Sequence, residues 1–346
     1  IIKDETKIII MSKNLTWMFF IKILKFFFNF SPKKNNFLPS SYLNNLYSSC
    51  NLEIVRNEKI IALPFYIPLI TNLINRIFRL PLLNIFCLAN ITILKKINQN
   101  FSDKKDNKVS FIIPCKNEQN NIKEFEKLIR ENNYTNEYLF GDDNSSDNTS
   151  HEIDNLRYKL SDYKIIKYDG PGVCKSDNVY KGIEYATGDI IVIYDADLTV
   201  SVQDIEFSIH ILKNTNADFI NCTRMIYPQK DGAMKFFNFI GNNFFAGLFS
   251  LLFKKKITDT LCGTKIFYKK DWMKIKKNNS KWGVKDLWGD FDLLIGAYKN
   301  NLKITEVPVT YYERKAEETK MTSVISNAIR MLLIVLSAYY KLRLMK

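Results

Sequence analysis

Two carboxylates that follow a buried apolar run are the residues best suited to chemistry in this sequence. Asp195 and Asp197 come directly after the branched apolar run Ile190–Tyr194, which has the length and composition of a strand buried on both faces. Residues two apart in an extended segment point the same way, and two like charges repel unless a cation lies near them. Carboxylate oxygens suit Mg²⁺ or Mn²⁺, and Mg²⁺ typically takes further oxygens from substrate phosphates. The pair therefore indicates a metal site, with a solvated acidic turn as the alternative.

The segments before Asp195 alternate between apolar runs and helical spacing, which predicts the sheet that positions these acids. An α/β sheet of this kind is doubly wound and mostly parallel, and ligands collect beyond the carboxyl ends of its strands. Two earlier strands also end in acids or Asn, at Pro114–Glu118 and Gly141–Thr149, so a nucleotide site is expected along that edge. The expected elements are a strand at 109–114, a helix at 118–132, a strand ending near 139, a helix at 151–160, a strand at 163–168, a glycine loop at 170–172 and a helix at 176–186.

Composition and charge exclude several classes of function. The chain has 346 residues and a net charge of +14, and residues 1–100 hold thirteen Lys and Arg against four Asp and Glu. These bases are interleaved with apolar residues, which is typical of segments on an anionic membrane surface. No zinc-finger, helix-turn-helix or RNA-binding signature is present, so nucleic acid is not the expected partner. Two histidines argue against a histidine-based zinc site or a Ser-His triad, and six scattered cysteines predict reduced thiols in a cytosolic protein.

Neither end of the sequence has an uninterrupted apolar run long enough to cross a bilayer. In residues 1–100 the apolar stretches are broken by bases, and they are expected to form the helices of an N-terminal extension, either core or interfacial. Met331–Tyr340 would cover about 15 Å, half of a hydrocarbon core, so no spanning helix is expected. Two apolar helices flanked by bases, Phe236–Phe253 and Ser323–Leu344, predict peripheral attachment to the cytoplasmic face of a membrane. The alternative is that both helices cover the sheet or meet a second subunit.

Five motifs in the same order resemble those of glycosyltransferase family 2, which has the GT-A fold. They fall at 112–118 (IIPCKNE), 142–149 (DDNSSDNT), 195–197 (DAD), 258–265 (TDTLCGTK) and 306–314 (EVPVTYYER). The last two are similar to the polyprenyl-phosphate branch, the dolichol-phosphate mannosyl- and glucosyltransferases. Residues 1–100 resemble more weakly, chiefly at Ile60–Pro68, the tail of a class I S-adenosylmethionine methyltransferase fused ahead of such transferases.

The resemblance implies an α/β architecture of the GT-A type, with a doubly wound, mostly parallel sheet flanked by helices. The catalytic domain would cover residues 108–330. Residues 1–100 would form an α-helical extension, a possible methyltransferase remnant, and residues 323–344 a C-terminal amphipathic helix.

The resemblance also implies roles for individual residues. Asp195 and Asp197 would hold Mg²⁺ or Mn²⁺ against the diphosphate of the donor, which gives Asp197 a catalytic role as well. Thr199 stands where the mannosyltransferases have a Gln that meets the metal, and Glu317 replaces a glycine of the loop after Arg314. The nucleotide-binding residues that it implies are Pro114, Lys116, Glu118, Asp143, Asp195, Arg224 and Lys320, with Asp143 at the base or ribose and the last two near phosphates.

Two further acids, Asp292 and Asp290, compete for the acceptor side. Asp292 stands 14 residues before Glu306, as the acceptor-side acid of the family does before its Glu-Val-Pro motif, and Asp290 lies two residues earlier. A hydroxyl acceptor would require this acid as a general base. A phosphate acceptor is already an anion at neutral pH, so the acid would then only orient it.

These features predict a metal-dependent, inverting hexosyltransferase that works at a membrane surface. Its donor would be a GDP- or UDP-hexose and its acceptor a polyprenyl phosphate. Three alternatives remain open at this point. They are a soluble glycan or protein acceptor, a nucleotide-sugar-binding scaffold with reduced turnover, and nucleic-acid binding by the basic ends.

Overall fold

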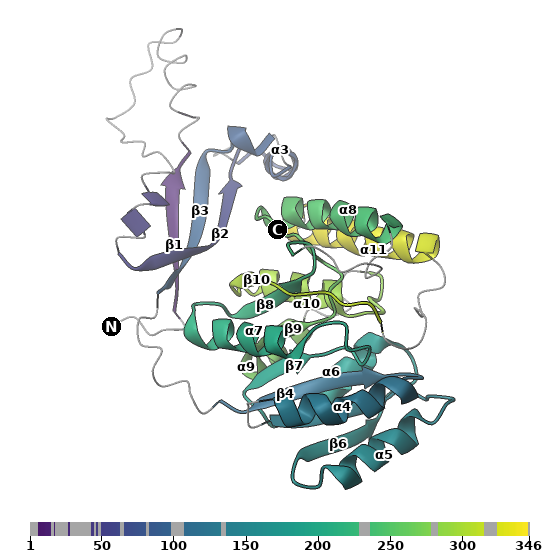
Figure 1. Ribbon diagram of the computed structural model, residues 1–346. Helices are drawn as coiled ribbons and strands as arrows, with labels where there is room; N and C mark the ends of the chain where they lie inside the picture. The colour runs from purple at the N-terminus through teal and green to yellow at the C-terminus, as the bar shows by residue number, and fades with distance from the viewer. Residues whose placement is uncertain are drawn as a thin grey trace. The chain divides into compact units, whose positions relative to one another are not determined.

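The computed structural model describes residues 6–14, 17, 27, 43–44, 46–47, 50–62, 66–80, 83–97, 107–132, 136–227, 236–277, 283–314 and 324–344 (Figure 1). The chain divides into two compact units. The larger is Asn100–Ser337, and the smaller combines Ile1–Gln99 with Ala338–Lys346. All the motifs expected to form the site fall in the larger unit.

A seven-stranded sheet forms the centre of the larger unit. Its strands are β4 (Val109–Cys115), β5 (Asn136–Asp142), β6 (Lys164–Asp169), β7 (Ile190–Ile193), β8 (Phe219–Thr223), β9 (Lys265–Tyr268) and β10 (Ile304–Pro308). They lie in the order β10-β8-β9-β7-β4-β5-β6. Within the described strands β9 runs antiparallel to β7 and β8, and the other pairs are parallel. The predicted doubly wound, mostly parallel sheet is confirmed.

Helices cover both faces of this sheet because its central strands are apolar on both sides. The helices are α4 (Gln119–Glu131), α5 (Thr149–Lys159), α6 (Lys175–Tyr185), α7 (Val202–Asn214), α8 (Phe236–Phe253), α9 (Lys269–Lys276), α10 (Asp290–Lys299) and α11 (Val324–Tyr339). On one face Phe111 of β4 shares a buried core with Phe125 of α4. On the other face Ile112 packs on Gly182 of α6, where a Cβ would come within 2.7 Å of it. The sheet is therefore the middle of three layers.

A buried carboxylate, Glu137, ties together the amino ends of the parallel strands. Its side chain lies at the start of β5, and the residue is 4% exposed. Oε1 accepts hydrogen bonds from Ser110 Oγ of β4 and from the Thr187 backbone, both at 2.5 Å, and Oε2 accepts from Lys164 of β6. Burial disfavours the charge, but the bonds from Lys164, Ser110 and Thr187 outweigh it and lower the pKa of Glu137 to about 2. A charged network thus holds the end of the sheet opposite to the predicted site.

The described part of residues 1–99 is built on a small antiparallel sheet. Strands β1 (Lys7–Lys13), β2 (Leu52–Ile60) and β3 (Ala89–Lys96) pair in the order β1-β3-β2 and are accompanied by α3 (Ile70–Ile77) and the 3₁₀ turn η1 (Leu83–Phe86). The expected α-helical extension is therefore wrong for these residues. Short apolar runs do not distinguish a strand from a helix, and the β-branched Ile and Thr of β1 and β3 pack well on a pleated surface. Most of residues 15–30 lie outside the described residues, and the methyltransferase resemblance stays a prediction.

The C-terminal helical segment covers residues 324–344, close to the expected range 323–344. α11 continues directly into a π-helical turn, η3 (Tyr340–Leu344). Among the described residues, Ile325–Arg343 is the one helical stretch long and apolar enough to cross a membrane, with 28% of it buried. The expectation of no spanning helix rests on the ten-residue run Met331–Tyr340, and the longer stretch meets criteria of length and composition that this run alone does not meet. A core helix of a soluble protein can meet the same two criteria, so they alone do not place it in a bilayer.

Arg343 of η3 is a buried residue of the smaller unit, 3% exposed. Its guanidinium pairs with Glu58 of β2 at 2.5 Å, and Arg56 of the same strand pairs with the same carboxylate. Arg79 donates to the backbone carbonyl of Arg343 at 3.3 Å. The η3 turn is therefore a structural part of the unit that contains the N-terminal sheet.

Replacing Glu137 with Gln keeps its shape and removes its charge. Because its folded-state pKa lies below the ordinary 4.5, the charge stabilises the fold fully above pH 4.5, and this contribution is lost as the pH falls toward 2. We expect Glu137→Gln to lower the free energy of unfolding at pH 7 by about 3 kcal/mol and to flatten its decline below pH 4.5, measured by urea denaturation. Glu184→Gln, in an exposed ion pair with Lys276, should cost less than about 1 kcal/mol. Equal losses in both would contradict the role of the network.

Candidate active site

Asp195 and Asp197 lie in a tight turn at the carboxyl end of β7. A hydrogen bond from the Tyr194 hydroxyl to the Val200 carbonyl, 2.7 Å long, closes this turn. The Asp195 side chain is 31% exposed and that of Asp197 is 10% exposed. Thr199 Oγ1 donates to Asp197 Oδ1 at 2.9 Å. Thr199 therefore orients the Asp197 carboxylate in this arrangement.

Each of the two acids is paired with a base. Lys175, the first residue of α6, places Nζ 2.5 Å from Asp195 Oδ1, and Arg314 places a guanidinium nitrogen 2.9 Å from Asp197 Oδ2. Burial disfavours the charge of Asp195, but Lys175 outweighs it and holds the pKa of Asp195 below its ordinary value. Burial and the charge of Asp195 raise the pKa of Asp197. The two carboxylates repel each other, and basic side chains balance their charge.

The donor set and the space around Asp195 fit a divalent cation. Gly263 comes so close that a Cβ would lie 2.2 Å from Asp195 Oδ2 and 2.7 Å from Lys175 Nζ, so only glycine lets the loop pass. Among the described residues no three His, Cys, Asp or Glu side chains form a metal cluster. The protein would therefore supply two carboxylates, and the substrate and water would supply the remaining oxygens. Mg²⁺ is usually bound beside phosphates in this way.

Asp290 shares the charged environment of Asp195, whereas Asp292 faces elsewhere. Both lie in the first turn of α10, and Lys265 Nζ is 3.5 Å from Asp290 Oδ1. Burial raises the pKa of Asp290 to about 6, against the charge of Lys265 and together with that of Asp195. Burial and the charges of Asp292, Asp286 and Asp290 raise the pKa of Tyr180 on α6, with Asp292 the largest of the three charges. Of the two competing acids, Asp290 is thus the one placed beside the predicted metal carboxylates.

Lys116 and Asp143 face each other beyond the ends of β4 and β5. Their side chains approach to 3.9 Å between Nζ and Oδ2. Asp143 is buried and accepts a hydrogen bond from the backbone N–H of Gly172 at 2.7 Å, so the glycine loop folds against it. Pro114 lies inside β4, and Glu118 is the residue that precedes α4. The structure thus brings Lys116, Asp143 and the glycine loop together, with Pro114 and Glu118 in supporting positions.

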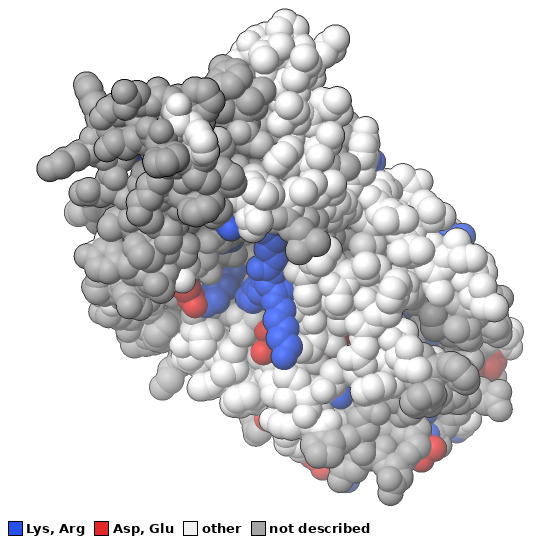
Figure 2. All heavy atoms as spheres, turned by 90° about the horizontal axis from the view of Figure 1, so that it is seen from above, with Lys and Arg blue, Asp and Glu red and all other residues white. Residues whose placement is uncertain are grey.

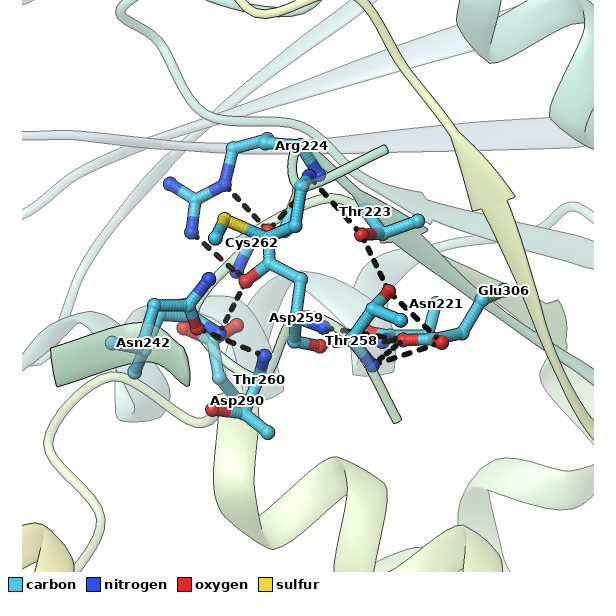
Figure 3. Close-up of polar contacts among 12 residues, drawn as sticks. Asn221, Thr223, Arg224, Asn242, Thr258, Asp259, Thr260, Cys262, Asp290 and Glu306 are labelled. Carbon is cyan, nitrogen blue, oxygen red and sulfur yellow. Dashed lines mark hydrogen bonds and ion pairs between the residues drawn. The ribbon is translucent and has the colours of Figure 1, made fainter. Parts of the chain in front are cut away.

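Arg224 is held by a buried carboxylate, as Figure 3 shows. Its Nε and a terminal nitrogen donate to Asp259 at 2.8 and 3.0 Å, and its guanidinium carbon lies 5.0 Å from the centre of the Tyr311 ring. Burial opposes the charge of Asp259, but Arg224 outweighs it and lowers the pKa of Asp259. Glu306 accepts a hydrogen bond from the Thr258 backbone at 2.9 Å, which holds the other end of the loop that carries Asp259. Arg224 is therefore a fixed cation.

Two predicted residues, Lys320 and Glu317, lie outside the described residues.

Four residues beside these acids were not expected from the sequence. Lys265 is fully buried against Asp290. Thr260 donates its backbone N–H to Asn242 Oδ1 of α8 at 3.3 Å, but Asn242 Nδ2 and Thr260 Oγ1 are buried without a partner in the part of the chain that the structure describes. An unpaired buried donor costs about 1–3 kcal/mol, so a polar partner that reached either atom would be stabilised there. The fourth residue is Lys175, and it is the one that the sequence could have indicated. A base in the first turn of a helix opposes the helix dipole, so its presence there points to an acidic partner.

The sequence is similar to that of known transferases. The profile of Glycosyl transferase family 2 matches residues 110–276. The dolichyl-phosphate beta-glucosyltransferase ALG5D of Trichomonas vaginalis is 27% identical over 261 residues, which cover 70% of this chain and 76% of that protein. The dolichyl-phosphate beta-glucosyltransferase ALG5C of the same organism is 24% identical over 237 residues, which cover 64% and 68%.

The fold is similar to that of a solved transferase. Glucosyl-3-phosphoglycerate synthase from Mycobacterium tuberculosis, in complex with Mn²⁺, UDP and glucosyl-3-phosphoglycerate, has a TM-score of 0.51 at 14% identity over 68% of this chain and 81% of that chain. The same enzyme in complex with phosphoglyceric acid has a TM-score of 0.51 at 13% identity, with the same coverage. Identity this low shows the fold alone, and it confirms the GT-A architecture. Together with the profile match over residues 110–276 and the curated relatives, this fold supports an enzyme of glycosyltransferase family 2.

Proposed function

We propose that this enzyme transfers a hexose from a UDP- or GDP-sugar to a polyprenyl phosphate, with inversion at the anomeric carbon and with Mg²⁺ or Mn²⁺ at Asp195 and Asp197. The observation that carries the proposal is this pair of carboxylates at the end of β7, each balanced by a base and closely approached by Gly263. The curated relatives, named dolichyl-phosphate beta-glucosyltransferases, support a lipid phosphate as the acceptor.

The residues of the site would divide the work of a single displacement. When bound, the cation would act as a Lewis acid on the departing diphosphate. Lys116 and Asp143 would hold the nucleoside, and Arg224, fixed by Asp259, would orient the acceptor phosphate. An acceptor oxygen attacks the anomeric carbon from the face opposite the diphosphate. The bond to the diphosphate breaks with its electron pair, so the configuration inverts in one step.

Asp290 and its neighbours fit the hydroxyls of the transferred hexose. The Asp290 carboxylate would accept hydrogen bonds, and the open donors of Asn242 and Thr260 would supply them (Figure 3). A mixed set of donors and acceptors matches hydroxyl groups, whereas an anionic phosphate would be repelled by Asp290. With a phosphate acceptor no proton has to be removed, so Asp290 would position the sugar instead of acting as a base.

The exposed sides of α8 and α11 support attachment at a lipid surface. Their exposed large apolar residues are Phe239, Ile240, Phe244 and Leu251 of α8 and Ile325, Ile329, Leu333, Leu336 and Tyr340 of α11. Figure 2 looks down on the side where these helices lie in Figure 1, and it shows a broad area without charged side chains. A large exposed apolar area marks an interaction site, and bases that flank both helices favour an anionic leaflet. We place the enzyme at the cytoplasmic face, where a lipid phosphate would meet it at the bilayer surface.

Calorimetric titration with UDP- and GDP-hexoses tests the metal site. We expect one donor to bind at least about ten-fold more tightly with Mn²⁺, because the cation neutralises the diphosphate, and Asp197→Asn to remove most of this gain. Asp189→Asn, at the amino end of the same strand, is the matched control and should bind like the unchanged protein. Donor binding that is absent or indifferent to Mn²⁺ would contradict metal dependence. Binding of the donor without hexose transfer would favour the alternative that the protein is a nucleotide-sugar-binding scaffold.

Kinetics of Asp290→Asn and Asp292→Asn with polyprenyl phosphate separate the two competing acids. Because a phosphate needs no general base, we expect Asp290→Asn to lower kcat about ten-fold or less, and Asp292→Asn to lower it by a smaller factor. A loss of ~10²–10⁴-fold would indicate a hydroxyl acceptor that needs a base. A larger effect at Asp292 would return the acceptor role to that residue. Both side chains are buried, so each variant is also followed by thermal unfolding. This measurement shows whether a lower kcat reflects a loss of folded protein.

Flotation with anionic liposomes at low salt tests the lipid surface. We expect the protein to float, and the pair Leu333→Glu and Leu336→Glu to reduce its recovery several-fold, because it places charges on the exposed side of α11. The pair Tyr158→Glu and Phe207→Glu, on exposed apolar positions of α5 and α7, is the control and should float normally. Carbonate washing releases a peripheral protein and retains one that spans through Ile325–Arg343. A protein that stays soluble would favour a soluble or protein acceptor.

A further inference from the structure

We propose that Lys175 and Arg314 are exchangeable counter-cations: they pair with Asp195 and Asp197 in the absence of a metal, and they would move to the diphosphate of the donor when a metal is bound. This inference rests on the proposed metal site and adds a property to it. It makes metal binding and nucleotide binding depend on each other through two named side chains. The two bases are positioning residues for the diphosphate.

Both carboxylates are fully engaged in the arrangement that the structure shows. Asp195 uses Oδ1 for Lys175, and its Oδ2 lies against the backbone of Gly263. Asp197 uses Oδ2 for Arg314 and Oδ1 for the hydroxyl of Thr199. A Mg²⁺ ion binds oxygen at about 2.0–2.1 Å, inside the distances at which these bases sit. A cation that binds Asp195 Oδ1 or Asp197 Oδ2 would therefore have to displace the base that is paired there.

The two bases are long side chains with room to move. The Lys175 side chain is 27% exposed and that of Arg314 is 36% exposed, whereas Lys265, the third base of the cluster, is fully buried and fixed against Asp290. The ordinary pKa of a lysine is about 10.4, so Lys175 stays a cation at neutral pH when it moves. Lysine and arginine are both strong partners for phosphate oxygens. A displaced base therefore gains a new partner only when the diphosphate is present.

Charge balance gives the sign of the coupling. Two acids and two bases are neutral together, so a divalent cation that binds alone leaves an excess of positive charge at the turn. The diphosphate removes that excess and binds the displaced bases as well. Each ligand therefore raises the affinity for the other, and by linkage the factor is the same in both directions. Lys175 stands at the start of α6, where a positive charge opposes the helix dipole. Its two partners, the Asp195 carboxylate and the diphosphate, explain why a base is placed there.

Binding of Mn²⁺ without nucleotide, followed by electron paramagnetic resonance of the free ion, tests the exchange. Lys175→Met removes the competing cation, so we expect it to bind Mn²⁺ about ten-fold more tightly than the unchanged protein. In the presence of Mn²⁺ the same variant should bind the free nucleoside diphosphate, UDP or GDP, more weakly. The factor by which Mn²⁺ and the nucleoside diphosphate raise the affinity for each other should therefore be smaller in this variant. Arg314→Met is the second variant, with the same expected direction, and circular dichroism checks that both fold.

Lys285→Met is the matched control because it removes one positive charge from a base that pairs at 2.5 Å with Asp177, also on α6. It should leave Mn²⁺ affinity within about two-fold. Unchanged or weaker Mn²⁺ binding by both Lys175→Met and Arg314→Met would overturn the exchange, and so would an equal gain in Lys285→Met. Failure of the metal site itself would give a different result. The unchanged protein would then bind no Mn²⁺, or Asp197→Asn would bind Mn²⁺ as tightly as the unchanged protein does.

Discussion

The larger unit is arranged around one electrostatic constraint, which is that two carboxylates two positions apart, one of them buried and one partly exposed, share the same turn. A buried charge is tolerated only with a partner. Lys175 at the start of α6 and Arg314 in the segment after β10 supply the partners, and Lys265 at the start of β9 pairs with the neighbouring Asp290. β9 is inserted antiparallel between β7 and β8, and the Gly263 loop that precedes it lies beside Asp195.

Stability and chemistry lie at opposite ends of the same strands. At the amino ends both oxygens of Glu137 accept hydrogen bonds, and its pKa falls to about 2. At the carboxyl ends the pKa of Asp290 rises to about 6, and the donors of Asn242 and Thr260 have no partner among the described residues. One end of the sheet is thus satisfied by the chain itself. The other keeps unmet charges and donors, as expected where a ligand completes the structure.

Local patterns were enough to predict the central strands and the acids that follow them, because the apolar runs at Val109–Cys115 and Ile190–Ile193 leave few alternatives. The choice between Asp290 and Asp292 was not predictable from spacing, since residues two apart in a helix point about 200° apart. Lys265 owes its role to a strand that returns from far along the sequence. The sheet of the smaller unit was missed because its short apolar runs fit helix and strand equally well. The site roles taken from the resemblance remain proposals.

The pairing of Glu58 with Arg343 joins residues that are 285 positions apart. During synthesis from the amino end, the strands of the smaller unit leave the ribosome long before the turn that completes them. The larger unit needs only residues up to 337, so it can close first, although its strands come later in the sequence. Contacts between distant residues form slowly, and unpaired strand edges attract other chains in the meantime. The strands of the smaller unit are therefore made well before the turn that completes their unit, and their edges stay unpaired in that interval.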